Sequence, residues 1–253
     1  MPSDPRDRVV ADAFDRQAAR FERAPLQSSA AALARLVAFA RLPPATPVLD
    51  AGCGPGLVAE AFLQAGHSVH GVDLSAEMVR RARERCARFG DRARFDQGSA
   101  LALDPGARFG AAVSRLVVHH VPVPGAFVAA QVERLRPGGV LVLCDHTTDP
   151  DPAASAWHNA IERARDVSHA RSLTPGELVD LLARAGLRSL ELAEDAHQLD
   201  FDEWFDRGTP ALAKAEVRRQ LLAGRARGFA PEPRPDGGVT IHGSWAFLRG
   251  VRG

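Results

Sequence analysis

The sequence predicts an α/β protein with an open, mostly parallel sheet and helices on both faces. Short, almost wholly apolar segments alternate with longer segments whose apolar residues recur at helical spacing. Strands without polar alternation are buried on both faces, as in parallel sheets. In addition, a glycine-rich stretch, VLDAGCGPG at 48–56, directly follows the first apolar segment. Ligand-binding loops of open sheets lie at this position.

The first half of the chain supplies most of the alternation. Residues 5–42 are expected to be helical until a cluster of prolines ends the pattern. Ser75 can cap a helix, while Gly66, Gly90 and the Pro-Gly-Gly turn at 137–139 can end helices. The expected strands are 48–50, 68–73, 94–97, 111–114 and 140–145, and the expected helices are 57–64, 75–89 and 124–135.

The pattern becomes more helical after residue 149. Thr174, Pro175 and Glu177 predict a capping box with proline in the first helical turn. The stretch PEPRPDGG, 231–238, predicts a turn-rich loop, so that the last strand would belong to a hairpin at the sheet edge. Helices are expected at 153–168, 174–186, 201–207 and 211–222, and strands at 187–192 and 244–251.

Composition excludes several function classes. The chain has 253 residues and a net charge of +1, so no overall field attracts nucleic acid or an anionic membrane. The three cysteines are far apart without a CxxC pair, and no metal-ligand cluster of usual spacing is present, so neither a disulfide framework nor a metal is expected. The N-terminus lacks an apolar signal core, and no apolar span could cross a bilayer. A cytoplasmic location is therefore expected.

The glycines after the first strand indicate a nucleoside ligand. Gly52, Gly54 and Gly56 permit a tight turn with positive φ and let a ligand lie against bare backbone. Asp73 ends the second strand beside that loop, where its carboxylate can accept both hydroxyls of a ribose. The alternative is that the glycines merely turn the chain, but the position of Asp73 favours a ribonucleoside site.

A dinucleotide fingerprint fits the loop only weakly. Its third glycine position falls on Leu57, or on Ala59 in a shifted register that begins late after the strand. The G-x-G-x-G form preceded by Asp50 is better suited to a ligand without pyrophosphate. A nicotinamide-dependent oxidoreductase stays open as an alternative.

Several spaced motifs resemble one known family. VLDAGCGPG, GVDLSAEMV and RPGGVLVLCD resemble the signature series of class I S-adenosylmethionine-dependent methyltransferases, most closely the menaquinone/ubiquinone C-methyltransferase-like group. The resemblance covers nearly the whole chain, including FDRQAARFERAP, VSRLVVHHVPVP, IERARDVSHAR and FDEWFDR. It implies a Rossmann-like, doubly wound, seven-stranded sheet with a helical lid. It also implies S-adenosyl-L-methionine as cofactor and S-adenosyl-L-homocysteine as product.

The same resemblance implies a division of the chain. Residues 1–46 would form an N-terminal helical lid segment, and 47–149 the cofactor-binding core. Residues 150–186 would form a helical lid and substrate region, and 187–253 the C-terminal part of the sheet with its helices.

The resemblance also assigns cofactor contacts. Asp50 would lie near the cofactor's ammonium group, Asp73 would hold the ribose, and Arg115 and Leu116 would face the sulfonium end. Such enzymes usually have Gly-Asp-Ala after the third strand, whereas this chain has Ser99 in place of the acid, which predicts a weaker adenine contact. The full set is Asp50, Gly52, Cys53, Gly54, Gly56, Asp73, Leu74, Met78, Gly98, Ser99, Ala100, Arg115 and Leu116.

Histidines near the same sheet edge are candidates for proton transfer. Methyl transfer needs a base only when the nucleophile holds a proton at working pH. His119 and His120 follow the fourth strand, and histidine titrates near neutrality. The alternative is a structural pair, one packed and one solvated. His146, after the fifth strand, is expected to line the substrate pocket.

A helix expected after residue 153 supplies further candidates. Glu162, Arg165, Asp166 and His169 recur at spacings of three or four, so they are expected to share one helix face. The alternative is a surface ladder of ion pairs. The resemblance favours a lid, with Arg165 contacting the substrate and His169 joining His119 and His120 as catalytic candidates. Trp157 is expected to wall the pocket or to be plain core.

Together these observations predict a methyltransferase acting on carbon or oxygen of a small organic acceptor, as a monomer or homodimer. The arginine-rich stretch at 79–94 could contact nucleic acid, but interrupting acids and scarce aromatics favour a solvated helix face. Two alternatives keep the fold and cofactor. One is a cyclisation or elimination reaction, and the other is a non-catalytic partner subunit.

Overall fold

Within residues 4–104 and 106–253, which the computed structural model describes, eight strands form one sheet. Seven lie in the order β3-β2-β1-β4-β5-β8-β6, and β7 pairs with β8. Strands β1 to β5 are parallel, whereas β8 runs antiparallel to its neighbours. The bounds are β1 Pro47–Ala51, β2 Ser68–Asp73, β3 Ala93–Gln97, β4 Phe109–Arg115, β5 Leu135–His146, β6 Leu187–Asp200, β7 Phe229–Pro233 and β8 Val239–Arg252.

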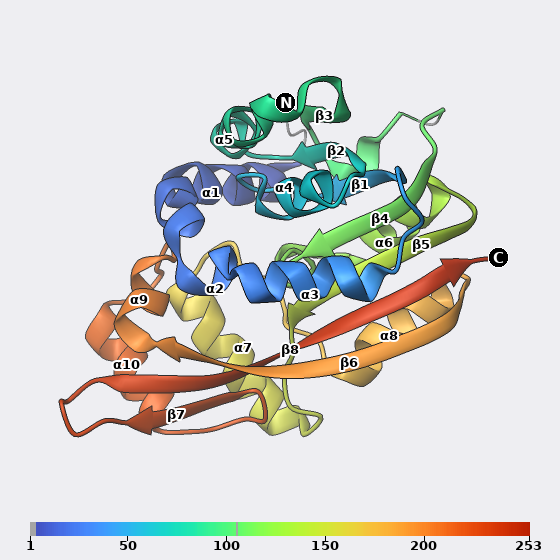
Figure 1. Cartoon of the computed structure of the whole chain (residues 1–253). Coiled ribbons are helices and arrows are strands. Elements are labelled where there is room, and N and C mark those ends of the chain that lie inside the picture. Colours follow the sequence, from blue (N-terminus) through green and yellow to red (C-terminus); the bar gives the residue numbers. More distant parts are fainter. Residues whose placement is uncertain (1–3, 105) are drawn as a thin grey trace.

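Helices cover both faces of the sheet (Figure 1). Helices α3, α4 and α5 contribute to the core on one face, and α6 and α8 to the core on the other. No described helix is both long and apolar enough to span a membrane. The bounds are α1 Pro5–Arg23, α2 Pro25–Ser28, α3 Ala30–Ala40, α4 Leu57–Gln64, α5 Ala76–Cys86, α6 Pro124–Glu133, α7 Pro152–Arg165, α8 Pro175–Arg184, α9 Phe201–Asp206 and α10 Lys214–Leu222, with 3-10 turns at Ala87–Arg92, Ala100–Ala102 and Val118–His120.

Side-chain alternation along β5 joins the two layers. Val142 packs into the core under α3 to α5, while Leu141 and Leu143 pack into the core under α6 and α8. All three side chains are at most 1% exposed. The nearly continuous apolar pattern therefore reflects burial on both faces, as the sequence predicts.

Several predicted boundaries differ from the structure. The helical stretch 5–42 is three helices, because Ala24 and Ser29 have non-helical backbone and the Ser29 side chain caps α3. The loop predicted at 231–238 is wrong in part, since β7 extends to Pro233. The last strand is not at the sheet edge, because β8 lies between β5 and β6. Pairing with β8 also extends β6 to Asp200, well beyond the predicted end at 192.

The extended halves of β6 and β8 support a third hydrophobic cluster. It joins α7, α9 and α10 to these strands and contains Ile161, Phe201, Trp204 and Phe229. Figure 1 shows these helices on the side toward which β4 points, together with α1 and α2. The carboxyl ends of the parallel strands, where open sheets bind ligands, are thus enclosed by helical segments from both ends of the chain.

Candidate functional site

The glycine loop is fixed against the second strand. The backbone N–H groups of Gly52 and Cys53 both donate to the carbonyl of Val72, at 2.8 and 3.1 Å. Gly52 has a φ of +77°, and a Cβ there would lie 2.6 Å from a methyl carbon of Val117. Glycine is therefore required at position 52 both by backbone conformation and by space.

Asp73 connects this loop to the next helix. Its Oδ2 accepts a hydrogen bond from the Gly54 N–H at 2.8 Å, and its Oδ1 accepts one from the Ser75 N–H at 2.9 Å. Burial raises the pKa of Asp73, although these two donors oppose that rise. Because a carboxylate oxygen accepts more than one hydrogen bond, both oxygens keep capacity for ligand hydroxyls.

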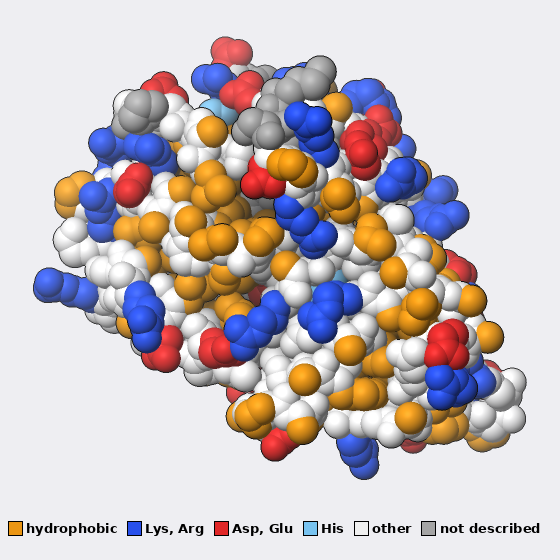
Figure 2. All heavy atoms as spheres, turned by 180° about the vertical axis from the view of Figure 1, so that it is seen from behind, with side chains coloured by type: hydrophobic (Ala, Val, Ile, Leu, Met, Phe, Trp, Pro, Cys, Tyr) orange, Lys and Arg blue, Asp and Glu red, His pale blue; other side chains and the backbone are white. Residues whose placement is uncertain are grey.

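A cavity of about 460 Å³ lies along the loop. Figure 2 shows a hollow edged by hydrophobic side chains on the back of the molecule. Ser99 lies on the cavity wall, where its Oγ accepts from the Leu101 N–H at 3.3 Å. Most residues that the sequence assigns to the cofactor line this cavity: Gly52, Cys53, Gly54, Asp73, Leu74, Met78, Gly98, Ser99, Ala100, Arg115 and Leu116.

Asp50 and Gly56, also assigned to the cofactor, lie behind the loop rather than on the cavity wall. Gly56 has a φ of +82° and is the N-cap of α4. Asp50 is 1% exposed, and its Oδ2 has no hydrogen-bond partner. Burial, aided by the charge of Asp73, raises the pKa of Asp50 to about 8. Such a carboxylate would be stabilised by a cation beyond the loop.

The backbone after β4 is strained where it reaches the cavity. Leu116 has a φ of +59°, which is uncommon for a residue other than glycine. Its N–H donates to the Cys144 carbonyl at 2.8 Å, which fixes this conformation. The neighbouring Arg115 donates to the carbonyls of Leu26 and Gln27, both at 2.9 Å, and so attaches α2 to the sheet.

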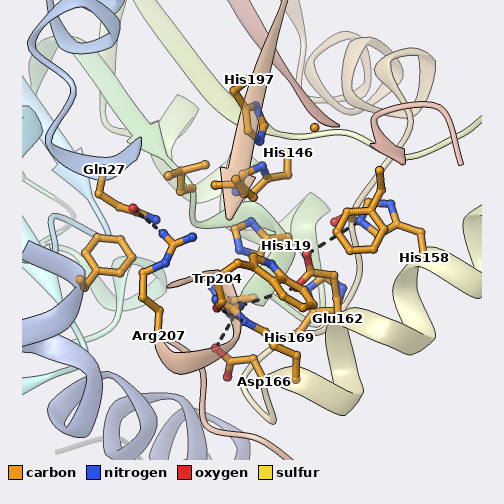
Figure 3. A pocket seen from close by; sticks show the side chains of 18 of the residues that line it. Gln27, His119, His146, His158, Glu162, Asp166, His169, His197, Trp204 and Arg207 are labelled. Carbon is orange, nitrogen blue, oxygen red and sulfur yellow. Dashed lines mark hydrogen bonds and ion pairs between the residues drawn. The ribbon is translucent and has the colours of Figure 1, made fainter. Parts of the chain in front are cut away.

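A second, smaller cavity of about 50 Å³ adjoins the first. The two cavities share Phe14, Phe21, Leu116 and His120 as lining residues. Figure 3 shows side chains of distant segments converging around this smaller cavity. Six of the nine histidines in the sequence line it: His119, His120, His146, His158, His169 and His197.

His119 and Asp145 form a closely paired dyad in the smaller cavity. The ring Nδ1 of His119 lies 2.5 Å from Asp145 Oδ1, and Asp145 is 2% exposed. A carboxylate can only accept, so Nδ1 carries the proton and Nε2 keeps its lone pair. Burial opposes the charged form of His119, but Asp145 outweighs this and raises the pKa of His119 above 6.5. The pair therefore has the properties of an oriented general base.

His120 belongs to a different hydrogen-bond chain. The hydroxyl of Ser168 donates to Asp166 Oδ1 at 2.6 Å and lies 3.1 Å from Nδ1 of His120. Because the Ser168 proton is directed to Asp166, Nδ1 of His120 is the donor in the second bond. Burial and the neighbouring His119 lower the pKa of His120 to about 3. His120 is thus neutral at working pH.

His169 and His146 are neutral as well. Nε2 of His169 donates to Asn159 Oδ1 at 2.9 Å, since that oxygen also accepts from the Ser172 N–H. Burial lowers the pKa of His169 well below 6.5. Burial, together with repulsion from His197, also lowers the pKa of His146 well below 6.5.

The predicted helix face at 162–169 is wrong in its geometry. Helix α7 ends at Arg165, and Asp166 is the C-cap with extended backbone. Glu162, Arg165, Asp166 and His169 nevertheless all line the smaller cavity. Nη1 of Arg165 lies 3.6 Å from Oε2 of Glu162 and 3.5 Å from Oδ2 of Asp166, so two carboxylates balance the charge of this guanidinium.

Trp157 lies away from both cavities. Its indole N–H donates to the Gln220 carbonyl at 3.3 Å, and its ring packs on Phe229. Trp204 lines the smaller cavity instead, with Arg165 at 5.0 Å from its ring. Among the residues that the structure describes, no group of three or more His, Cys, Asp or Glu could hold a metal ion.

Sequence analysis overlooked four polar lining or supporting residues: Asp145, Ser168, His197 and Arg207. Asp145 had a visible signal, because it ends a strand of the signature series. Ser168 and Arg207 lie within the motifs IERARDVSHAR and FDEWFDR, but nothing in those motifs indicates that they face a cavity, and His197 has no signal. His197 and Arg207 come from the extension of β6 and the end of α9, whose path the local pattern does not specify.

The larger cavity fits the expected S-adenosylmethionine. Asp73 keeps acceptor capacity for ribose hydroxyls, and Leu74 and Met78 supply apolar wall for a base. The partnerless Oδ2 of Asp50, buried behind the glycine loop, suits a cationic ligand. The unusual Ser99 leaves a polar atom, without charge, at the position expected for the adenine amine.

Comparisons with known proteins agree with this fit. A methyltransferase domain family matches residues 14–192. A ubiquinone biosynthesis O-methyltransferase of Xanthomonas axonopodis pv. citri is 33% identical over 176 residues, which cover 66% of this chain and 72% of that protein. An uncharacterized methyltransferase of Bacillus subtilis, YcgJ, is 30% identical over 177 residues, covering 69% and 70% of the two chains.

Solved structures share the fold. The crystal structure of Bacillus subtilis YcgJ superposes with a TM-score of 0.80 and 25% identity, covering 88% of this chain and 98% of that chain. Phosphoethanolamine N-methyltransferase 2 of Haemonchus contortus, solved with S-adenosylhomocysteine, gives a TM-score of 0.65 at 18% identity. That match covers 94% of this chain and 57% of the other.

Proposed function

The chain belongs to the methyltransferase domain family and is an S-adenosylmethionine-dependent enzyme of the class I fold, and from that premise we propose that it methylates a hydroxyl oxygen of a small organic acceptor. The acceptor lies in the smaller cavity, and His119 is the general base. The His119–Asp145 dyad carries this proposal, because it places an oriented base beside the cofactor cavity.

The proposed reaction asks little of the protein beyond alignment and one proton transfer. When bound, S-adenosylmethionine supplies a methyl group on a positively charged sulfur. Nε2 of His119 removes the proton of the acceptor hydroxyl, whose oxygen keeps the electron pair that forms the new bond to carbon. The methyl–sulfur bond breaks, and a neutral thioether leaves. Asp145 stabilises the imidazolium that results.

Two features support oxygen as the methylated atom. A hydroxyl holds its proton at neutral pH, so its methylation benefits from a base whose pKa lies near or above 6.5. The relative from Xanthomonas axonopodis pv. citri is named as an O-methyltransferase. His120, neutral and in contact with the His119 ring, would orient the hydroxyl at the junction of the two cavities.

We propose that α1 and the segment directly after α7, which contact each other beside the cavities, act as the lid. The α1 side chain of Arg6 donates to the carbonyls of Val167 and Ser168, at 2.8 and 2.7 Å. Gln17, also on α1, donates to Asp166 at 3.1 Å. These contacts are polar and would be replaced by water on opening, which suits a segment that must admit an acceptor.

The test is turnover with a panel of hydroxylated small molecules, read by product mass and by S-adenosylhomocysteine release. We expect one added methyl per S-adenosylhomocysteine formed. His119→Ala should lower kcat by about 100-fold or more, because a positioned base contributes about that much. The matched control is His242→Ala, whose side chain is 41% exposed and pairs with Glu232. S-adenosylhomocysteine affinity should be unchanged in both variants.

Two outcomes would overturn the proposal. Products without added mass would mean that the reaction is a cyclisation or elimination. A kcat for His119→Ala equal to that of His242→Ala would mean that His119 takes no proton.

A further inference from the structure

Arg207 is a buried cation without a close carboxylate partner. It is 6% exposed and lines the smaller cavity. Its Nη1 donates to Gln27 Oε1 at 2.5 Å, and its Nε has no hydrogen-bond partner. The Glu203 carboxylate, on the same helical segment, lies 3.9 Å away. A buried guanidinium with unused donors is costly unless an anion pairs with it.

The other cations of this cavity are already balanced. Arg165 lies between Glu162 and Asp166, and His119 is paired with Asp145. Burial and repulsion from Arg165 lower the pKa of Arg207 to about 10, so its charged form is disfavoured as it stands. Arg207 is therefore the residue of this cavity that would gain most from a bound anion.

His197 supplies a second polar group without a partner in the same cavity. Its Nδ1 is buried and makes no hydrogen bond. The ring lies across the strand pair from Gly243, where a Cβ would collide with it, so glycine at 243 makes room for the ring. Figure 3 shows His197 and His146 on the side of the cavity opposite Asp166, and Arg207 beside Gln27. His197 and Arg207 both line this cavity, and burial followed by the charge of Arg207 lowers the pKa of His197 to about 4.

The size of the cavity limits the ligand. Its volume of about 50 Å³ is well below the roughly 150 Å³ of a cavity that holds benzene. Its walls carry histidines, arginines and carboxylates rather than apolar side chains alone. A small ligand with polar groups suits these walls, and one with as many heavy atoms as benzene would extend past Leu116 and His120 into the larger cavity.

Resting on the proposed O-methylation, we propose that the acceptor is a small hydroxy acid whose carboxylate is bound by Arg207 and His197. The guanidinium fork presents parallel N–H donors that match the two oxygens of a carboxylate. Gln27 holds the fork in orientation from α2. The carboxylate fixes the acceptor at the far end of the smaller cavity, so that its hydroxyl lies toward His119.

The experiment measures binding without turnover, using lactate and its neutral isostere lactamide as probes. Both are titrated by NMR into protein saturated with S-adenosylhomocysteine. We expect lactate to bind at least about tenfold more tightly than lactamide, as a charge-assisted bidentate pair provides. Lactate should also raise the pKa of the His197 ring, because an anion favours the imidazolium.

Three variants identify the residue responsible. Arg207→Gln should remove the preference for lactate, and Arg207→Lys, which keeps the charge but not the fork, should leave an intermediate preference. Arg225→Gln is the matched control, since Arg225 is exposed on the segment after α10 and should leave the preference unchanged. S-adenosylhomocysteine affinity and circular dichroism report whether each variant is folded.

The inference is wrong if the wild type binds both probes equally or neither, or if Arg207→Gln keeps the preference. Should Arg207→Gln fail to fold, the preference of the wild type for lactate over lactamide and the rise in the pKa of His197 still test the proposal. His119→Ala should keep the lactate preference, because the base does not hold the carboxylate. Loss of turnover in His119→Ala with the lactate preference intact concerns only the base. A wild type that methylates an acceptor but shows no preference for lactate over lactamide refutes this inference alone.

Discussion

His119 and His120 lie with their ring centroids 4.0 Å apart and their planes tilted by 44°, yet each is hydrogen-bonded to a different partner. His119 is bound to Asp145, and His120 is bound to Ser168, which is bound in turn to Asp166. Two imidazolium rings at this separation would repel one another strongly. The pair can therefore hold at most one added proton, and Asp145 directs that proton to His119.

Asp145→Asn should remove the negative charge at position 145 while keeping a side chain of the same shape there. The carboxylate raises the pKa of His119, so its removal lowers that pKa. A base must be neutral to work, so wild-type kcat/KM falls as pH drops through a pKa above 6.5. In the variant this fall should move to lower pH, and the plateau should decrease by about 100-fold or more, because the proton on Nδ1 is no longer fixed. A pH–rate profile with an unmoved acidic limb would contradict the assignment.

His119→Asn should change the titration of its neighbour. Burial and His119 together lower the pKa of His120 to about 3, and the substitution removes the second cause. The pKa of His120 should therefore rise, as followed by NMR of the ring protons between pH 3 and 7. His242→Asn, at an exposed site, should leave His120 unchanged. An unchanged pKa in His119→Asn would mean that burial alone sets it.

The geometry of the glycine loop and its neighbouring strand and helix could be predicted from the sequence, for a local reason. Gly52, Asp73 and Ser75 act through neighbours within one strand–loop–helix unit, so spacing along the chain specifies their geometry. The parallel pairing of β1 to β5 follows from the alternation of elements, whereas their order in the sheet does not. His119 and His120 could likewise be placed near the ligand edge, since they directly follow β4.

The smaller cavity, proposed to bind the acceptor, depends on long-range contacts that no local pattern encodes. His169 lies beyond the end of α7 and reaches the cavity only because Asn159 holds its ring. Arg207 reaches it from α9 and is held by Gln27 of α2, 180 positions away. Trp157 shows the converse, because its helical spacing matches a pocket wall but tertiary packing directs it toward Gln220.

Asp50 should couple cofactor binding to proton release. At pH 7 its carboxyl is protonated, because its pKa is about 8. A bound cation lowers that pKa, so the proton leaves, and affinity for S-adenosylmethionine should rise between pH 6 and 8. Calorimetry in buffers of different ionisation enthalpy counts the protons. On binding S-adenosylmethionine at pH 7, the wild type should release more protons than Asp50→Asn does. Equal counts would mean that the cofactor's charge does not reach Asp50.

Two glycines of the loop should respond differently to alanine, although both have positive φ. Gly56 has a φ of +82°, and a Cβ there would lie 3.0 Å from Cα of Ala82, which is backbone of α5. Gly54 has a φ of +50°, and its Cβ would meet only the Phe21 ring edge at 4.0 Å. Gly56→Ala should thus lower the free energy of unfolding by about 2–4 kcal/mol through strain and overpacking together.

Gly54→Ala should lower the free energy of unfolding by only about 1–2 kcal/mol, the cost of the left-handed backbone alone. Its methyl group would stand between the loop and Phe21, both of which line the larger cavity, so affinity for S-adenosylhomocysteine should fall. Urea denaturation and calorimetric titration of both variants provide the two measurements. Equal losses of stability would show that α5 yields at Ala82, and full affinity in Gly54→Ala would show that the ligand does not lie against this glycine.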